Sequence, residues 1–229
     1  MKLSVIIPCY NEKNTVLSVI KKIYGLKVET EIIVVDDNSS DGSLQIISSN
    51  KSFINHFVSH SKNTGKGGAI KSAKNFVSGD YVVIQDADNE YFPEDLEKML
   101  NIMIDKKLKV LYGSRVLGKK RYFHNSSFTS IFRIFANHVL TIFSNFVNGQ
   151  KITDAHTCYK MFESKLFKSI DLKENDFAFC PEITTKISNL KIKICEIPID
   201  YKGRTYKEGK KISFKDGFKA VKAILKHKA

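Results

Sequence analysis

The first part of the sequence alternates short runs of Val and Ile with longer segments of helical periodicity, and this alternation constrains the fold most strongly. The strands are expected at residues 3–7, 31–35, 53–59 and 81–85. The helices between them are expected at residues 12–25, 41–50 and 67–78. Strands that are apolar along their whole length are typical of parallel sheets covered by helices on both faces. The pattern therefore predicts an α/β fold with a mostly parallel central sheet.

The rest of the chain continues this pattern less regularly. Further helices are expected at residues 93–106, 128–147 and 214–226, and further strands at 109–112 and 192–199. No internal repeat, low-complexity tract or linker interrupts the sequence, and 229 residues are a usual length for one α/β domain. We expect residues 1–201 to form the main domain, with 202–229 as a basic C-terminal segment and amphipathic helix of the same domain.

The formal net charge of +13 is concentrated near the C-terminus. Residues 202–229 hold nine lysines and one arginine against two carboxylates, a net charge of +8, so the rest of the chain carries +5. A charge gathered in one segment favours a local anionic surface over nucleic acid as the partner. The chain uses only four arginines among its 37 basic residues, which are Arg115, Arg121, Arg133 and Arg204.

The four cysteines are scattered and show no CxxC spacing, which argues against a disulfide scaffold or a structural zinc site. Residues 1 and 2 lead directly into the first strand, so no signal peptide is expected. The sequence contains no run of about 18 uncharged apolar residues, the length that usually spans a membrane. Reduced thiols in the cytoplasm are the resulting expectation.

The strand at 81–85 ends in Asp86-Ala87-Asp88, and Glu90 follows two residues later. Alternate residues at a strand end project toward the same space, so these carboxylates can share one ligand. Hard oxygen donors of this kind suit Mg²⁺ or Mn²⁺, which usually also bind substrate phosphates. The motif predicts a divalent cation at Asp86, Asp88 and Glu90, although on its own such a motif more often marks a solvated turn after a strand.

Three other polar segments follow expected strands or precede expected helices, at residues 8–12, 36–42 and 63–68. In open parallel sheets, ligands bind outside the carboxyl ends of the strands, where all these segments lie. Acidic side chains there can accept hydrogen bonds from a base or ribose. Glycines permit close backbone approach, and a helix N-terminus favours phosphate. Together the segments indicate a nucleotide site.

These segments resemble the family 2 glycosyltransferases, whose GT-A fold is a Rossmann-like three-layer sandwich. The resemblance covers nearly the whole chain. It is strongest to the polyprenyl-phosphate branch, which includes the dolichyl-phosphate mannose synthases. The later stretches that carry it lie at residues 113–115, 154–160, 196–199 and 203–212. Glu90 stands where synthases of the mannose type usually have Gln, and Arg133 lies one position from a second arginine of that branch.

The resemblance implies roles for individual residues. The nucleoside pocket would be lined by Pro8, Tyr10, Glu12 and Asp37. The diphosphate and its metal would be held by Asp86, Ala87 and Asp88, with Glu90 near the same ion. The phosphates of donor or acceptor would face Arg115, Arg204 and Lys210, and Lys66 belongs to the same nucleotide-sugar site.

The chemistry expected is a metal-dependent, inverting transfer of a sugar from a nucleotide diphosphate-sugar to a polyprenyl (dolichyl or undecaprenyl) phosphate. Such an acceptor is largely ionised and needs little general base, whereas a sugar hydroxyl needs a carboxylate within hydrogen-bond reach. Asp154 is the candidate for that base, for orienting an arginine, or for a simple cap after Thr153. The expected catalytic residues are Asp88, Arg115 and Asp154.

Two alternatives stay open. The same fold can transfer to the hydroxyl of a glycan or lipid-linked sugar, or the chain can be a non-enzymatic module that binds anionic surfaces. The apolar helix at 128–147 is either a core helix or an interfacial one. The lysine-rich helix at 214–226 either lies on a membrane or packs against the sheet. We expect a peripheral enzyme on the cytoplasmic face of an anionic membrane, without nucleic acid.

Overall fold

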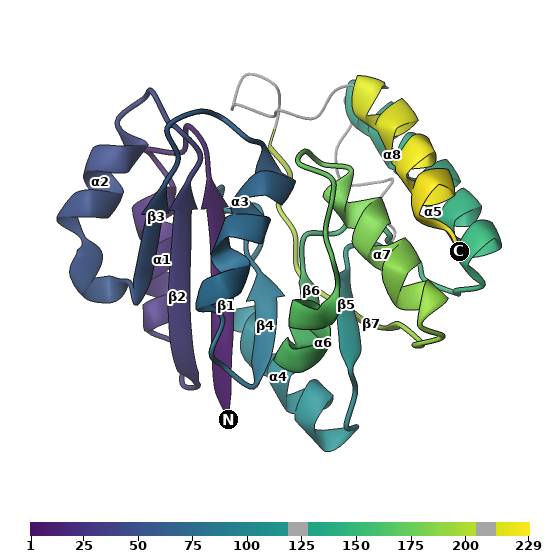
Figure 1. Cartoon of the computed structure of the whole chain (residues 1–229), viewed down its shortest axis with the longest axis horizontal. Helices are drawn as coiled ribbons and strands as arrows, with labels where there is room; N and C mark the ends of the chain where they lie inside the picture. The colour runs from purple at the N-terminus through teal and green to yellow at the C-terminus, as the bar shows by residue number, and fades with distance from the viewer. Residues whose placement is uncertain (119–127, 205–213) are drawn as a thin grey trace.

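The computed structural model describes residues 1–118, 128–204 and 214–229, without the side chains of 128–133 and 214–215. Within these residues, seven strands form one sheet in the order β3-β2-β1-β4-β6-β5-β7 (Figure 1). Neighbouring strands are parallel except that β6 runs antiparallel to both β4 and β5. The strands are β1 (Lys2–Cys9), β2 (Glu29–Asp36), β3 (His56–Ser59), β4 (Tyr81–Ile84), β5 (Val110–Ser114), β6 (Lys160–Glu163) and β7 (Cys195–Pro198). The expected α/β fold with a mostly parallel sheet is confirmed.

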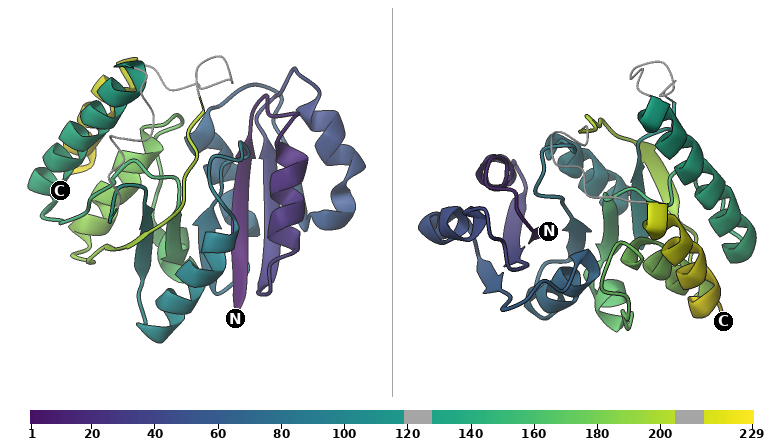
Figure 2. Two further views of the ribbon diagram at one scale, coloured as in Figure 1. Left: turned by 180° about the vertical axis from the view of Figure 1, so that it is seen from behind. Right: turned by 90° about the horizontal axis from the view of Figure 1, so that it is seen from above.

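Helices cover both faces of the sheet and give the three layers of the sandwich. Figures 1 and 2 show α3, α6 and α7 on one face and α1 and α4 on the other. The helices are α1 (Val16–Tyr24), α2 (Ser43–Ser49), α3 (Lys66–Ala73), α4 (Glu94–Asp105), α5 (Phe128–Asn148), α6 (Ser164–Ser169), α7 (Phe179–Asn189) and α8 (Phe214–His227). Two short 3₁₀ turns, η1 (Lys51–Phe53) and η2 (Lys74–Phe76), follow α2 and α3.

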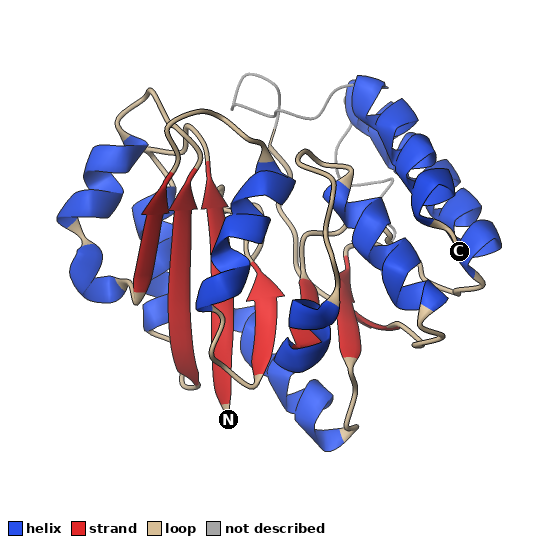
Figure 3. Cartoon of the chain, viewed as in Figure 1, coloured by secondary structure: helices blue, strands red, loops and turns tan. Residues whose placement is uncertain are grey.

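The polar segments after β1, β2 and β4 meet at one edge of the sheet, as Figure 3 shows by the arrowheads that point the same way. β1 and β2 are in register along their length, with Cys9 opposite Asp36, so the residues that follow both strands start side by side. The Asp37 N–H donates to the Cys9 carbonyl at 2.8 Å and fixes this junction. The sheet thus gathers the motifs found in the sequence.

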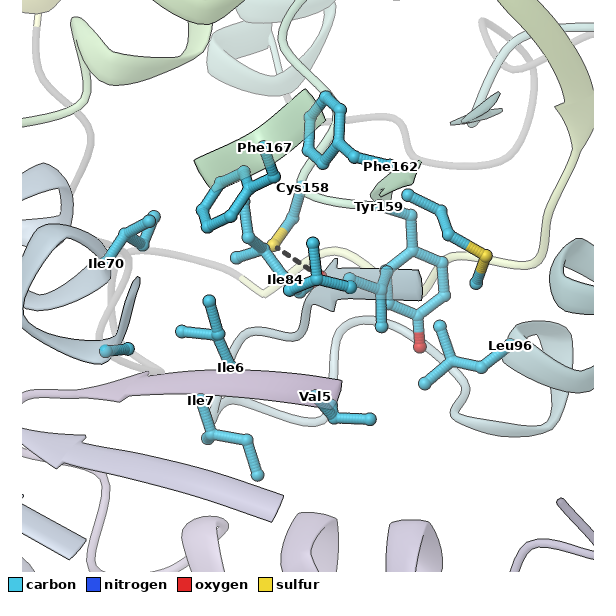
Figure 4. Close-up of a cluster of buried hydrophobic side chains, with 14 of the residues drawn as sticks. Val5, Ile6, Ile7, Ile70, Ile84, Leu96, Cys158, Tyr159, Phe162 and Phe167 are labelled. Atoms are coloured by element: carbon cyan, nitrogen blue, oxygen red, sulfur yellow. Dashed lines mark hydrogen bonds between the residues drawn. The ribbon is translucent and has the colours of Figure 1, made fainter. Parts of the chain in front are cut away.

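Buried side chains pack the strands that end at this edge against each other and against α3. In Figure 4, Ile6 of β1 points toward Ile70 of α3 and Ile84 of β4, whereas Val5 and Ile7 point to the opposite side of the strand. The Cys158 thiol donates to the Ile84 carbonyl at 3.6 Å, which ties the turn before β6 to the strand that carries the acidic motif. Cys158 is a buried free thiol, as are Cys9 and Cys180.

α8 packs mainly against α7 and α5, so the alternative in which this helix packs against the sheet is not the one observed. The three helices stand together beyond β5 and β7, at the end of the molecule opposite α2 (Figures 1 and 2). None of the helices described by the structure combines the length and the apolar character that crossing a membrane requires.

Candidate active site

The acidic motif turns sharply after β4. Asn89 adopts a left-handed backbone conformation with φ 55°, and the Glu90 N–H donates to Asp88 Oδ1 at 3.1 Å. This turn brings Glu90 beside Asp88 and directs it toward residues 201–204. The Glu90 carboxylate accepts hydrogen bonds from the Tyr201 hydroxyl at 2.5 Å and from the Arg204 N–H at 2.7 Å.

Arg204 joins carboxylates from two different strand ends. Its guanidinium donates two hydrogen bonds to Glu12, at 2.9 and 3.0 Å, and one to Asp88 Oδ2 at 2.8 Å. Its Nε lies 3.6 Å from Glu90. Residues that are far apart in the sequence therefore meet at one point. The sequence assigns Glu12, Asp88, Glu90 and Arg204 to one site, and the structure brings these four residues together.

Lys66 provides the second cation of the cluster. Its Nζ lies 2.5 Å from Asp86 Oδ1, donates to Cys158 Sγ at 3.4 Å and sits 5.9 Å from the centre of the Phe177 ring. Burial alone would raise the pKa of Asp86, but the Lys66 charge and hydrogen bond lower it. Asp86 is therefore held as a carboxylate.

The cluster contains more negative than positive charge. Glu12, Asp86, Asp88 and Glu90 contribute four carboxylates, and Lys66 and Arg204 contribute two cations. Burial, together with the charges of Asp86 and Glu90, raises the pKa of Asp88 to about 7. A divalent cation would supply the missing two positive charges.

The donor set fits Mg²⁺ or Mn²⁺. These ions commonly take one or two protein carboxylates and complete their coordination with water and phosphate. In the described part of the chain no three His, Cys, Asp or Glu side chains are gathered as a preformed metal site. Asp86 and Asp88 would thus hold the ion together with a ligand, with Glu90 alongside.

Arg115 and Asp154 form a buried pair beside this cluster. Arg115 Nε and Nη2 donate to the two carboxylate oxygens at 2.7 and 2.8 Å, and the Arg115 N–H adds a third bond at 3.0 Å. The guanidinium lies 5.1 Å from the centre of the Tyr201 ring. Burial would raise the pKa of Asp154, but the charge and hydrogen bonds of Arg115 hold it well below its usual range. Of the roles considered for Asp154, this geometry favours orienting an arginine.

Two residues that the sequence analysis does not assign hold the turn around Asp154. The Glu196 carboxylate accepts from the Thr153 N–H at 2.6 Å and from the Asp154 N–H at 3.0 Å. Lys160 is fully buried, donates to the Ala155 and Thr157 carbonyls, and lies 4.4 Å from the Tyr112 ring. Both belong to the later stretches of the family resemblance, which is the signal that could have drawn attention to them.

Asp37 organises the loop before α3. One oxygen accepts from the Thr64 N–H and hydroxyl, both at 2.8 Å, and lies 2.7 Å from His60 Nδ1. The other accepts from the Gly65 N–H at 2.7 Å. Its neighbour Asp36 is fully buried.

The glycines of this loop accommodate the chain's own backbone. A Cβ at Gly65 or Gly67 would collide with main-chain atoms of residues 174–176, and the Gly68 N–H donates to the Asn175 carbonyl at 2.9 Å. The close approach expected of a phosphate is made here by another loop of the protein.

The remaining assigned residues lie at the same edge where the structure describes them. Pro8 belongs to β1, Tyr10 follows it with 38% of its surface exposed, and Ala87 is buried between the two aspartates. Lys210 lies outside the described residues.

The sheet with its acidic turn after β4 defines a glycosyltransferase of the GT-A type. Residues 4–171 match the family described as Glycosyl transferase family 2, and the chain belongs to this family. The resemblance found in the sequence is thereby confirmed.

Among characterised relatives, the chain is similar to a low-salt glycan biosynthesis hexosyltransferase of Haloferax volcanii, with 28% identity over 97% of this chain. It spans only 53%, about half, of that relative. It is also similar to the UDP-N-acetylglucosamine–dolichyl-phosphate N-acetylglucosaminyltransferase of Methanococcus voltae, with 26% identity over 96% of this chain and 93% of the relative.

A solved structure with the same fold is glucosyl-3-phosphoglycerate synthase from Mycobacterium tuberculosis, in complex with Mn²⁺, UDP and its product. The TM-score is 0.73, and the match covers 99% of this chain and 79% of that chain at 16% identity. This likeness concerns the fold.

Proposed function

We propose that the protein transfers a sugar from a nucleotide diphosphate-sugar to a polyprenyl phosphate in a metal-dependent, inverting reaction. The observation that carries the proposal is the partly buried cluster of four carboxylates and two cations at the strand edge, directly beside the Arg115–Asp154 pair. The dolichyl-phosphate in the name of the Methanococcus relative supports the acceptor class. Membership of the family argues against the non-enzymatic binding module.

In this proposal the donor binds across the strand ends. Asp86 and Asp88 hold Mg²⁺ or Mn²⁺ with the diphosphate, and Glu90 supports the same ion. When bound, the ion neutralises negative charge on the leaving diphosphate. The nucleoside lies against Pro8, Tyr10, Glu12 and Asp37, next to Ala87, and the phosphates face Lys66, Arg204 and Lys210.

The acceptor phosphate is assigned to Arg115. A guanidinium held in place by a carboxylate presents its remaining donors in a fixed direction, which suits a phosphate oxyanion. Because a phosphate monoester is already ionised near neutral pH, no proton has to be removed from it. The Asp154 carboxylate, engaged by three hydrogen bonds from Arg115, therefore serves as a positioning group rather than as a base.

We also propose that residues 202–229 belong to the same folded unit as 1–201, because Arg204 reaches Glu12 and Asp88 and α8 packs on α5 and α7. The enzyme then works as a peripheral protein on the cytoplasmic face of an anionic membrane, where its acceptor is anchored.

The direct test supplies radiolabelled UDP- and GDP-sugars, Mn²⁺ and either undecaprenyl or dolichyl phosphate. We expect label in the organic-solvent phase with one donor, and none after chelation of the metal with EDTA. Label that appears only in a water-soluble glycan would support the sugar-hydroxyl acceptor instead. Label in no product with any donor would remove the proposal.

A further inference from the structure

Exposed apolar side chains gather on two adjacent helices. In the described parts of the chain eleven large hydrophobic residues are exposed, and six of them belong to α5 and α8. Scattered exposed apolar residues are ordinary, but a contiguous group marks an interaction surface. The six are Phe135, Val139, Ile142, Phe146, Phe218 and Leu225, and we call them the apolar face.

On α5 the usual amphipathic order is reversed. Phe135, Val139, Ile142 and Phe146 follow one another at intervals of four, three and four residues, which places them on one side of the helix. Phe146 is 87% exposed. A helix whose apolar side faces outward needs an apolar neighbour outside the fold.

The opposite side of α5 is polar and buried. Thr141, Ser144 and Asn148 are each less than a tenth exposed, and Asn148 Nδ2 donates to Thr185 Oγ1 of α7 at 3.1 Å. The inward side of α5 is therefore attached to α7 through a side-chain hydrogen bond. This leaves the apolar face unused by the core.

α8 continues the apolar face and adds positive charge. Its buried side consists of Ala220, Ala223 and Ile224, and its exposed side carries Phe218, Lys222 and Leu225. Lys219 and Lys226 flank this side and remain more than half exposed, although they pair with Asp176 and Glu174. Lysines around an apolar strip are typical of helices that lie in the interface of an anionic bilayer.

We propose that the apolar face docks on an anionic lipid bilayer, with Lys222 and its neighbouring lysines at the headgroups. Both helices lie at one end of the molecule, and each begins on the side where the strands end (Figures 1 and 2). Docking there places the catalytic edge beside the membrane surface. A second copy of the chain fits this surface less well, because a two-fold contact would set lysines against their own equivalents.

The inference rests on the proposed function, which has the enzyme on an anionic membrane, and it adds the surface that makes the contact. It is tested without donor, acceptor or metal, so that membrane binding is measured separately from sugar transfer. The full chain is sedimented with vesicles of phosphatidylcholine, with and without phosphatidylglycerol. We expect binding to the anionic vesicles. The double variant Ile142→Ser/Phe146→Ser should reduce the partition coefficient at least about tenfold, and Lys222→Glu should reduce it severalfold.

Matched controls change the same residue types elsewhere. Tyr24→Ser removes a 58% exposed aromatic ring from α1, and Lys98→Glu reverses an exposed charge on α4. Both should bind vesicles like the unaltered chain. Thermal unfolding of all four variants, together with sugar transfer to a short, detergent-dispersed polyprenyl phosphate, distinguishes lost docking from lost folding or lost chemistry.

Equal vesicle binding by the double variant and the unaltered chain would overturn the inference. It would also be overturned if the chain formed dimers that the double variant dissociates, while neither form bound vesicles. Failure of sugar transfer with normal vesicle binding would count against the proposed function alone.

Discussion

Arg115, Lys66 and Arg204 each lie against a carboxylate in the site, and these pairs determine how single residues affect the protein. Arg115 is only 8% exposed and has its charge balanced by Asp154. Lys66 is balanced by Asp86, and Arg204 by Glu12 and Asp88. Removing one partner of such a pair leaves a buried charge without compensation, which costs more than the pair itself contributes.

Asp154→Asn tests whether Asp154 is needed to balance the charge of Arg115. The substitution keeps the size of the side chain but leaves the Arg115 charge unbalanced, so we expect a loss of about 3–5 kcal/mol in the free energy of unfolding. Chemical denaturation measures the change. Asp171→Asn is the control, because its carboxylate pairs with Lys173 at the surface with 74% of the side chain exposed. A stability change as small as that of the control would show that Asp154 is not needed to balance Arg115.

Glu31 sets a pH dependence away from the active site. Burial would raise its pKa, but hydrogen bonds from Ser4, Ser78 and Lys2 lower it from 4.5 to about 2. The unfolded chain therefore takes up this proton first as the pH falls. The contribution of Glu31 is complete above about pH 5 and is lost as the pH falls toward 2.

We expect this contribution to be of the order of 3 kcal/mol. Unfolding midpoints in urea at neutral and acidic pH measure it. Glu31→Gln should be less stable at neutral pH and should lose less stability on acidification than the unaltered chain. Glu29→Gln, at the exposed start of β2, should change neither quantity. An unchanged acid sensitivity in Glu31→Gln would refute the assignment.

At the scale of elements, α3 depends on a close contact with the loop at residues 174–176. Gly67→Ala would place a Cβ against the Glu174 carbonyl, so the loop or the helix must shift. We expect a loss of about 1–3 kcal/mol, seen as a lower melting temperature. Gly25→Ala, where a Cβ meets only ordinary contacts, should melt like the unaltered chain. Equal melting temperatures of the two variants would mean that the contact between α3 and the loop does not contribute to stability.

The elements that the sequence predicts are those with simple periodicity. β1, β2 and β4 are found because Val and Ile fill strands that are buried on both faces. β6 and α7 are not predicted, since β6 is four residues long and begins with the buried Lys160, and α7 is buried on most sides. In α7 even Glu182 and Thr184 are fully buried, so no polar face marks the helix.

The same distinction applies to the site. Glu12, Asp86 and Asp88 are found because they directly follow strands, and parallel strands bring their ends together. Glu196 and Lys160 are missed because they act on backbone groups of an irregular turn, which no periodicity records. Their positions depend on the finished sheet rather than on neighbours in the sequence.

At the scale of the whole molecule, ligand binding and stability are coupled. A nucleotide diphosphate bound with Mn²⁺ should raise the melting temperature, since a ligand at about 100 times its Kd adds about 2.7 kcal/mol. Comparing UDP with GDP in a thermal-shift measurement identifies the base. Asp88→Asn should remove the metal-dependent part of the shift, and Asp105→Asn, at the end of α4, should preserve it. A full shift in Asp88→Asn would exclude Asp88 from the metal site.

The loop at residues 174–176 also determines where the chain can be divided. Its backbone fills the space above the α3 glycines, while Glu174 and Asp176 hold Lys226 and Lys219 of α8. A fragment that ends after residue 201 would lose both ion pairs to α8, the ion pairs of Arg204 with Glu12 and Asp88, and the packing of α8 on α7. Constructing a minimal version of this enzyme therefore means shortening surface loops, and leaving the last helix in place.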